Sequence, residues 1–279
     1  MAQFVEEVER GERFEFGKNW ARFLGSLDDH RILKAEASLR EMLDLADLRG
    51  LRFLDIGSGS GLFSLAARRM GARVYSFDYD PQSVDCTREL RNRYFPQDSD
   101  WVVEQGSALD AAYVRSLGAF DIVYSWGVLH HTGAMWQALE NAALPVTTGG
   151  RLFVALYNDQ GTASRRWTTI KRLYNRWPPP ARFPLALAVL VNQWWRRWVK
   201  DLLRLRPFAS WRAYGEERGM SPWRDLFDWV GGYPFEVSKP EQIFDFYRDR
   251  GFTLVKLKTC GGALGCNEFV FVRERPRAQ

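Results

Sequence analysis

Between residues 51 and 158 short apolar runs alternate with segments of helical periodicity, and this alternation restricts the possible folds more than any other feature of the sequence. Helical segments separate five runs that are expected to form strands: LRFLDIG, ARVYSFDYD, WVVEQGS, FDIVYSW and RLFVALYN. Strands that alternate with helices predict a parallel sheet covered by helices on both faces.

The end of the chain follows a different pattern. The runs FTLVKLKT and NEFVFVRE are joined by the glycine-rich turn CGGALG, which is typical of an antiparallel hairpin. The predicted fold is therefore an α/β, Rossmann-like sheet of seven strands, mostly parallel, with a helical insert after the fifth strand. The expected segments are an N-terminal helical lid over 1–50, the core over 51–158, the insert over 159–235, and a final helix and hairpin over 236–279.

Composition narrows the class of protein. The sequence is 46% hydrophobic and 26% charged, as in ordinary globular proteins. Cys86, Cys260 and Cys266 are too few and too scattered for a disulfide framework, and no Cys/His cluster has zinc spacing, so no metal is expected. The N-terminus is charged, and no apolar run approaches the roughly 20 residues of a membrane span. The expected compartment is the cytoplasm.

The insert is strongly basic. Residues 161–218 hold 13 Lys or Arg against three acidic residues, a balance of +10 in a chain of net charge +5, together with six of the 12 tryptophans. Its centre predicts an amphipathic helix. One face is expected to carry Val191, Trp194, Trp195, Trp198, Val199, Leu202 and Leu203, and the other Asn192, Gln193, Arg196, Arg197, Lys200 and Arg204.

A glycine-rich turn provides the main chemical motif. The segment LDIGSGSG, residues 54–61, follows the first expected strand and opens a helix. Glycines permit a sharp turn and a close ligand approach, and the helix N-terminus offers free N–H groups. Asp55 precedes the glycines, where it would repel a diphosphate but suits a ligand with an ammonium and a sulfonium. Asp78 ends the next strand, where a carboxylate accepts hydrogen bonds from ribose hydroxyls.

These motifs resemble the class I S-adenosylmethionine-dependent methyltransferases, and in particular the branch of ubiquinone-biosynthesis O-methyltransferases. The similarity covers LDIGSGSG, FDYD, VVEQGSALD and FDIVYSWGVLHHTG, roughly residues 50–158, and the C-terminal hairpin. It implies S-adenosyl-L-methionine as cofactor. The resemblance implies that Asp55, Gly57 and Gly59 surround the methionine part of the cofactor and that Asp78 binds the ribose. It also implies that Tyr79 flanks the adenine and that Ser107 and Ala108 cover the adenine edge.

Other residues complete the expected cofactor set. Ser58, Gly61, Ser125 and Trp126 lie in the same motifs, and a lid like that of related methyltransferases brings Lys18 or Trp20 to the methionine end. An alternative is that the aromatic residues of the lid only anchor it to the core. Ser107 stands where the family often has an acidic residue, so Asp110 or a backbone amide is expected to meet the adenine amino group.

A nicotinamide dehydrogenase is the competing interpretation of the glycine turn, with Asp55 and Asp78 merely ending strands. It would need a glycine at position 62, where Leu62 stands. The absence of an Asn-Pro-Pro-Tyr or Asp-Pro-Pro-Tyr motif after the fourth strand argues against methylation of a nucleobase amine.

The loops after the fourth and fifth strands are expected to line the acceptor pocket. His130 or His131 is the candidate general base, because a histidine accepts a proton near neutral pH. The equal alternative is that one histidine contacts the cofactor or caps a helix and the other packs. Candidate acceptor residues, each of which could instead be a turn or strand-end residue, are Tyr157, Asn158, Tyr233, Glu236 and Asn267.

The sequence thus predicts methyl transfer to an oxygen of a small or lipid-like acceptor. The alternatives are an N-methyltransferase acting on a peptide, sugar or amine, and a non-catalytic protein that docks to a membrane or nucleic acid. The insert is expected to cover the substrate. The second interpretation of the insert is peripheral contact with the inner face of a membrane through residues 185–205. A third is that its apolar side packs within a homodimer. Nucleic acid is not the expected partner.

Overall fold

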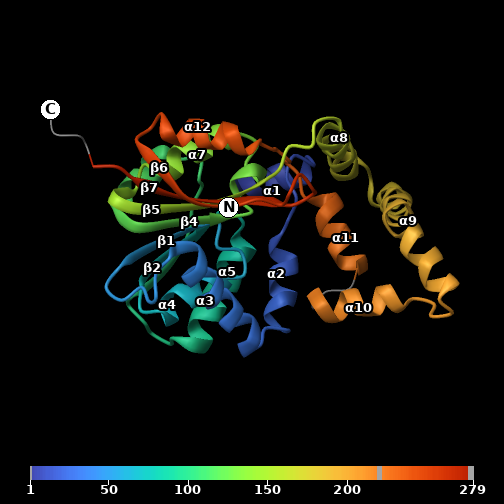
Figure 1. Cartoon of the computed structure of the whole chain (residues 1–279), viewed down its shortest axis with the longest axis horizontal. Helices are drawn as coiled ribbons and strands as arrows, with labels where there is room; N and C mark the ends of the chain where they lie inside the picture. Colours follow the sequence, from blue (N-terminus) through green and yellow to red (C-terminus); the bar gives the residue numbers. More distant parts are fainter. Residues whose placement is uncertain (1, 219–221, 276–279) are drawn as a thin grey trace. The chain divides into compact units, whose positions relative to one another are not determined.

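A computed structural model describes residues 2–218 and 222–275 (Figure 1). The chain forms two compact units. The sheet unit contains Glu15–Ser164 and the segment from Phe235 onward, and the helical unit contains Ala2–Phe14 and Arg165–Pro234.

The sheet unit is built on one seven-stranded sheet of order β3-β2-β1-β4-β5-β7-β6. The first five strands pair in parallel, and β7 pairs antiparallel with both β5 and β6. The predicted fold class, with its C-terminal antiparallel hairpin, is thereby confirmed. The strands are β1 Arg52–Ile56, β2 Arg73–Asp78, β3 Trp101–Gln105, β4 Phe120–Trp126, β5 Val146–Tyr157, β6 Phe252–Lys258 and β7 Cys266–Arg273.

Helices cover both faces of this sheet, and each face has its own apolar core (Figure 1). The first face is covered by α3 Asp29–Leu43, α4 Leu62–Arg69 and α5 Pro81–Tyr94, and α2 Gly17–Leu24 packs against α5. The second is covered by α6 Ala111–Ser116, α7 Met135–Ala143 and α12 Pro240–Arg248.

The strand order sets the place of a ligand site. The chain runs outward from β1 through β2 to β3 and then returns to β4 on the other side of β1. Ligands of such sheets bind outside the carboxyl ends of the strands, at the point where the order reverses. In this chain that point lies between β1 and β4, where the glycine turn after β1 and the histidine segment η1 Leu129–His131 after β4 begin.

The helical unit consists of α1 Ala2–Glu9, most of α8 Thr162–Arg176, α9 Pro179–Leu203, α10 Ala209–Arg218 and α11 Pro222–Gly231. Its core gathers Tyr174, Ala186, Val189, Leu190, Trp194, Leu226 and Val230. Within the described ranges no helix is both long and apolar enough to cross a membrane.

The predicted amphipathic face of α9 needs correction. Trp194 is buried and Trp198 packs with it beside Trp211, whereas Trp195 is 48% exposed and Leu202 is 67% exposed. Successive residues of a helix point about 100° apart, so neighbouring tryptophans cannot share one narrow stripe. The helix therefore has a buried apolar side and a second apolar side that faces outward.

Candidate functional site

The glycine turn packs closely against the loop after β4. Gly57, Gly59 and Gly61 have φ values of +79°, +54° and +80°, which favour glycine. The N–H groups of Gly57 and Ser58 donate to the Phe77 carbonyl at 2.8 and 3.2 Å and so tie the turn to β2. A side chain at Gly57 would overlap the methyl groups of Val128, which directly precedes η1. The glycine turn and the histidine segment are therefore in contact.

We expect Gly57→Ala to lower the free energy of unfolding by about 3 kcal/mol, from backbone strain and overlap with Val128. Gly149→Ala is the matched control, because Gly149 has a φ of +78° with open space around it. It should cost only about 1 kcal/mol, from strain alone. Urea unfolding of both variants checks this, and equal losses would contradict the packing of the turn on the β4 loop.

Asp78 lies at the end of β2 and faces the glycine turn. Its Oδ2 accepts the Gly59 N–H at 2.9 Å, and its Oδ1 accepts the Asp80 N–H at 2.9 Å. Burial raises the pKa of Asp78 to about 6, although these backbone donors oppose the rise. The Tyr79 N–H is a third backbone donor to this carboxylate. Since a carboxylate has about four acceptor positions, one remains for a ligand.

Asp55 is deeply buried beneath the turn, with 2% of its surface exposed. Its Oδ2 accepts the hydroxyl of Ser64 at 2.5 Å, and Ser64 and Ser76 lie 2.7 Å apart. Because the single Ser64 hydrogen goes to Asp55, Ser76 donates to Ser64, and the Trp101 indole N–H donates to Ser76 at 3.0 Å. This chain of donors points toward Asp55 and joins β1, α4, β2 and β3.

The protonation of Asp55 is expected to affect stability. Burial, with a smaller contribution from Asp78, raises the Asp55 pKa to about 7. Because the folded chain then binds this proton more tightly than the unfolded chain, the free energy of unfolding should fall as pH rises from about 4 to 7. In Asp55→Asn this part of the decline should vanish. Urea unfolding at pH 5 and pH 8 compares the two proteins, and parallel changes would contradict a raised pKa.

The segments expected around an adenine hold one another through local hydrogen bonds. The Tyr79 carbonyl accepts Gln105 Nε2 at 3.1 Å, and Ser107 Oγ accepts the Leu109 N–H at 3.2 Å. Ala108 is 8% exposed, and its carbonyl accepts Asn141 Nδ2 at 2.8 Å.

Asp110, the residue expected to meet the adenine amino group, is the N-cap of α6. Its Oδ1 accepts the Tyr113 N–H at 3.0 Å. The carboxylate of Asp110 is thus engaged with the start of a helix.

The segment before α3 reaches the glycine turn. The indole Nε1 of Trp20 lies 3.1 Å from the position that a Cβ on Gly59 would take, so Trp20 covers this glycine. The Gly17 N–H donates to Asp80 Oδ2 at 2.7 Å and fixes the start of α2 beside the start of α5. The side chain of Lys18 lies outside the described part of the chain. Sequence reasoning missed the link between residues 17 and 80, because no local pattern marks such a distant pair.

Two predicted cofactor residues at the end of β4 differ in exposure. Ser125 is fully buried, and its hydroxyl donates to the Ile56 carbonyl at 2.9 Å, which joins β4 to β1. Trp126 is 44% exposed. Ser125 therefore holds the ends of β4 and β1 together, whereas the side chain of Trp126 is accessible to a ligand.

The two adjacent histidines lie in an aromatic cluster at the ends of β4 and β5. Their ring centroids are 4.5 Å apart, and Tyr157 lies 4.0 Å from His130 and 5.4 Å from His131. Phe16 stands 5.1 Å from His131, and Phe235 stands 5.2 Å from Tyr157. Because His130 is fully buried and His131 only half-buried, ligand access favours His131.

The neutral tautomer of His130 follows from its contact with β5. Its Nδ1 accepts the Tyr157 N–H at 3.4 Å, so the ring hydrogen is on Nε2. With one nitrogen engaged as an acceptor and the other protonated, His130 is poorly suited to take up a proton from an acceptor molecule.

Glu236 fixes the histidine segment. Its carboxylate oxygens accept the Met135 N–H at 3.0 and 3.2 Å, at the N-terminus of α7. Its own N–H donates to the His130 carbonyl at 2.9 Å. Burial raises the Glu236 pKa, although the backbone donors Met135 and Gly133 oppose the rise. A carboxylate is favourable at a helix N-terminus, so Glu236 positions η1 and α7.

The remaining predicted acceptor residues belong to both units. Asn267 Nδ2 donates to Asn158 Oδ1 at 3.0 Å, and Asn267 Oδ1 accepts the Cys260 N–H at 3.1 Å, so this pair holds the β6–β7 turn. Tyr233 belongs to the helical unit, where its hydroxyl accepts Arg172 Nε at 3.3 Å. Across the described residues, no group of three or more His, Cys, Asp or Glu side chains could hold a metal ion.

Known proteins share the motifs and the fold. A methyltransferase domain family model matches residues 54–154. A ubiquinone biosynthesis O-methyltransferase from Xanthomonas oryzae pv. oryzae is 32% identical over 112 residues, which cover 40% of this chain and 45% of that protein. The chain thus spans less than half the length of this curated relative.

Solved structures extend the likeness over most of the chain. An O-methyltransferase family protein from Burkholderia thailandensis is 16% identical, with a TM-score of 0.55 over 97% of this chain and 67% of that one. Magnesium protoporphyrin IX methyltransferase from Synechocystis PCC 6803, solved with bound S-adenosylhomocysteine, is 16% identical, with a TM-score of 0.53 over 87% of this chain and 83% of that one. At these identities the likeness shows the fold.

Two observations on the structure agree with the family match. The glycine turn follows β1, and acidic residues lie at the ends of β1 and β2. Residues 54–154 of this chain therefore match a methyltransferase domain, and the sheet unit has the fold of class I S-adenosylmethionine-dependent methyltransferases.

Proposed function

We propose that the chain transfers the methyl group of S-adenosylmethionine to a hydroxyl oxygen of a small-molecule acceptor, with S-adenosylhomocysteine as the second product. The observation that carries this proposal is the contact between Gly57 and Val128. This contact joins the glycine turn to the segment that bears His131, which supports a methyl donor and a proton acceptor at one sheet edge.

Residues of this chain suit the cofactor. The glycine turn offers backbone without side chains to the methionine part, and the Asp78 carboxylate keeps an acceptor position for a ribose hydroxyl. Tyr79, Ser107 and Ala108 lie at the ends of β2 and β3, where the adenine is expected. When bound, the cofactor supplies an electrophilic methyl group on a sulfonium.

His131 is the residue that we assign as general base. Its half-buried ring beside Tyr157 and Phe16 is accessible to an acceptor, whereas His130 is buried and uses Nδ1 as an acceptor for the backbone of β5. A hydroxyl becomes a better nucleophile as its proton is removed, and imidazole takes up a proton near neutral pH. The aromatic rings around His131 would pack against a planar acceptor and hold it in line with the methyl group.

Similarity to ubiquinone biosynthesis O-methyltransferases supports oxygen as the accepting atom. The test uses radiolabelled S-adenosylmethionine with paired acceptors, a catechol and the corresponding aromatic amine. Label on the catechol oxygen, confirmed by mass spectrometry of the product, is the expected result. Transfer to the amine alone would contradict the choice of oxygen. No transfer to either compound, by a chain that binds S-adenosylhomocysteine, would contradict an acceptor of this class.

A further inference from the structure

Helix α9 exposes an apolar side that no described residue of the helical unit covers. Ala186, Leu190 and Trp194 face the core of this unit, whereas Val191, Trp195 and Val199 are 44%, 48% and 47% exposed. The outward residues recur at intervals of four, which places them on one side of the helix. A second apolar stripe is unnecessary for folding of the unit and indicates a surface that meets something apolar.

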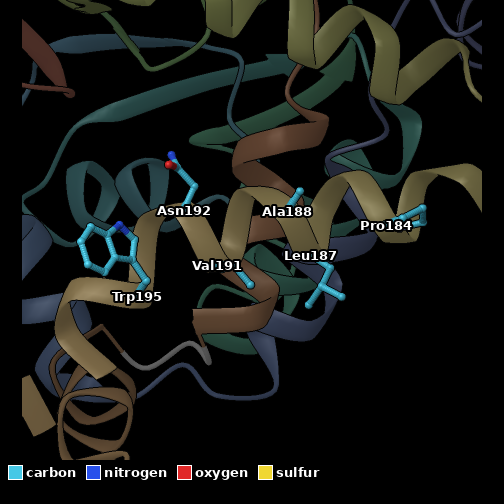
Figure 2. A pocket seen from close by; sticks show the side chains of 6 residues that line it. All are labelled: Pro184, Leu187, Ala188, Val191, Asn192 and Trp195. Carbon is cyan, nitrogen blue, oxygen red and sulfur yellow. The ribbon is translucent and has the colours of Figure 1, made fainter. Parts of the chain in front are cut away.

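Figure 2 shows the central part of this surface. A shallow depression of about 580 Å³ is lined by six residues, all from α9: Pro184, Leu187, Ala188, Val191, Asn192 and Trp195. Because one helix alone supplies the lining, the depression does not enclose a small molecule. The depression is instead part of a flat apolar area that can contact a larger apolar surface.

The end of α9 continues the exposed apolar side into a turn. Leu202, Leu203, Leu205 and Phe208 are 67%, 80%, 89% and 62% exposed. Leu205 and Phe208 have φ values of +54° and +61°, in the left-handed region that is unfavourable for bulky L residues. The turn thus bears strain while it presents large apolar side chains to solvent.

Cations surround this apolar end. Five basic residues between positions 196 and 206 are exposed: Arg196, Arg197, Lys200, Arg204 and Arg206. The one acidic residue among them, Asp201, is buried and accepts the Ser210 hydroxyl and N–H at 2.7 and 2.9 Å. Arg196 lies 5.4 Å from the Trp195 ring, so a cation borders the apolar side. A second copy of this surface would bring like charges together, whereas anionic headgroups would neutralise them.

We propose that the outward side of α9 and the turn over residues 202–208 bind the surface of an anionic lipid bilayer. The leucines and aromatic rings enter the boundary between headgroups and acyl chains, and the arginines contact lipid phosphates. This proposal concerns a surface of the helical unit and does not depend on which acceptor is methylated.

Flotation of the full chain with lipid vesicles tests this surface. Vesicles of phosphatidylcholine with one third phosphatidylglycerol should bind the chain at least tenfold more tightly than vesicles of phosphatidylcholine alone. Leu203→Ser with Leu205→Ser should weaken binding at least tenfold, and Arg204→Gln with Arg206→Gln about thirtyfold. Val255→Ser with Leu257→Ser, at exposed positions of β6, is the matched control and should have no effect.

Circular dichroism and binding of S-adenosylhomocysteine check that each variant folds. Equal binding to neutral and anionic vesicles would overturn the proposal, and so would folded leucine variants that bind as well as the unaltered chain. The chain could instead fail to bind vesicles and form a dimer that the leucine substitutions dissociate. That result would overturn the proposal and assign the surface to a second copy of the chain.

Discussion

Replacement of His131 by alanine is expected to lower the turnover number by a factor of about 10² to 10⁴, while S-adenosylhomocysteine binds with unchanged affinity. The expected loss follows from removal of a proton acceptor that stands beside Tyr157, three residues after the Val128 that touches the cofactor turn. Since the proposed contact is with the acceptor, the affinity for the cofactor product should not change.

The measurement is methyl transfer at saturating S-adenosylmethionine across a range of pH. The unaltered chain should lose activity as pH falls and the His131 ring gains a proton, and His131→Ala should lose this limb of the profile. His30→Ala is the matched control, because the third histidine is exposed on α3 and should have no influence. Unaltered rates in both His130→Ala and His131→Ala would exclude a histidine base.

Replacement of Asp78 by asparagine is expected to weaken binding of S-adenosylhomocysteine about 100-fold. A hydrogen bond to a charged group contributes about 1.5–3 kcal/mol, and the amide of asparagine can accept through only one of its two polar atoms. The same change removes the acceptor of either the Gly59 or the Asp80 N–H, which loosens the glycine turn.

Calorimetric titration of Asp78→Asn measures the loss directly. Asp85→Asn provides the control, since Asp85 is exposed on α5 and pairs with Arg88 at 3.2 Å. An affinity within about threefold of the unaltered chain, in a folded Asp78→Asn variant, would contradict the place of this carboxylate on the ribose.

The fold was predictable because its determinants are local. Apolar runs separated by helical periodicity specify parallel strands with crossover helices, and the glycine-rich turn specifies the final hairpin. The chemically informative residues Asp55, Asp78, His130 and His131 also lie where parallel strands end, which one sheet topology brings to a common edge.

Contacts between distant segments could not be predicted in this way. The carboxylate of Glu236 at the start of α7 and the indole of Trp20 over Gly59 depend on tertiary packing, which leaves no periodic pattern. Lys171 is a further case, because it is 1% exposed with its ammonium donating to the Trp229 carbonyl and 4.0 Å from that ring. Burial lowers the Lys171 pKa to about 7, whereas its sequence context is that of an ordinary basic helix.

Helix α9 shows how periodicity can mislead when both sides are apolar. Trp194 and Trp195 were expected on one face, but the first is 3% exposed in the core and the second is 48% exposed. The apolar residues of α9 extend around so much of the helix that they form two apolar sides. Only the tertiary packing shows which side is buried and which is exposed.

The most direct measurement is calorimetric titration of the purified chain with S-adenosylhomocysteine, beside a titration with NAD. Binding of one S-adenosylhomocysteine per chain, with no binding of NAD, is the predicted result. Absence of S-adenosylhomocysteine binding by the folded chain would contradict the assignment of the glycine turn and Asp78 to this cofactor.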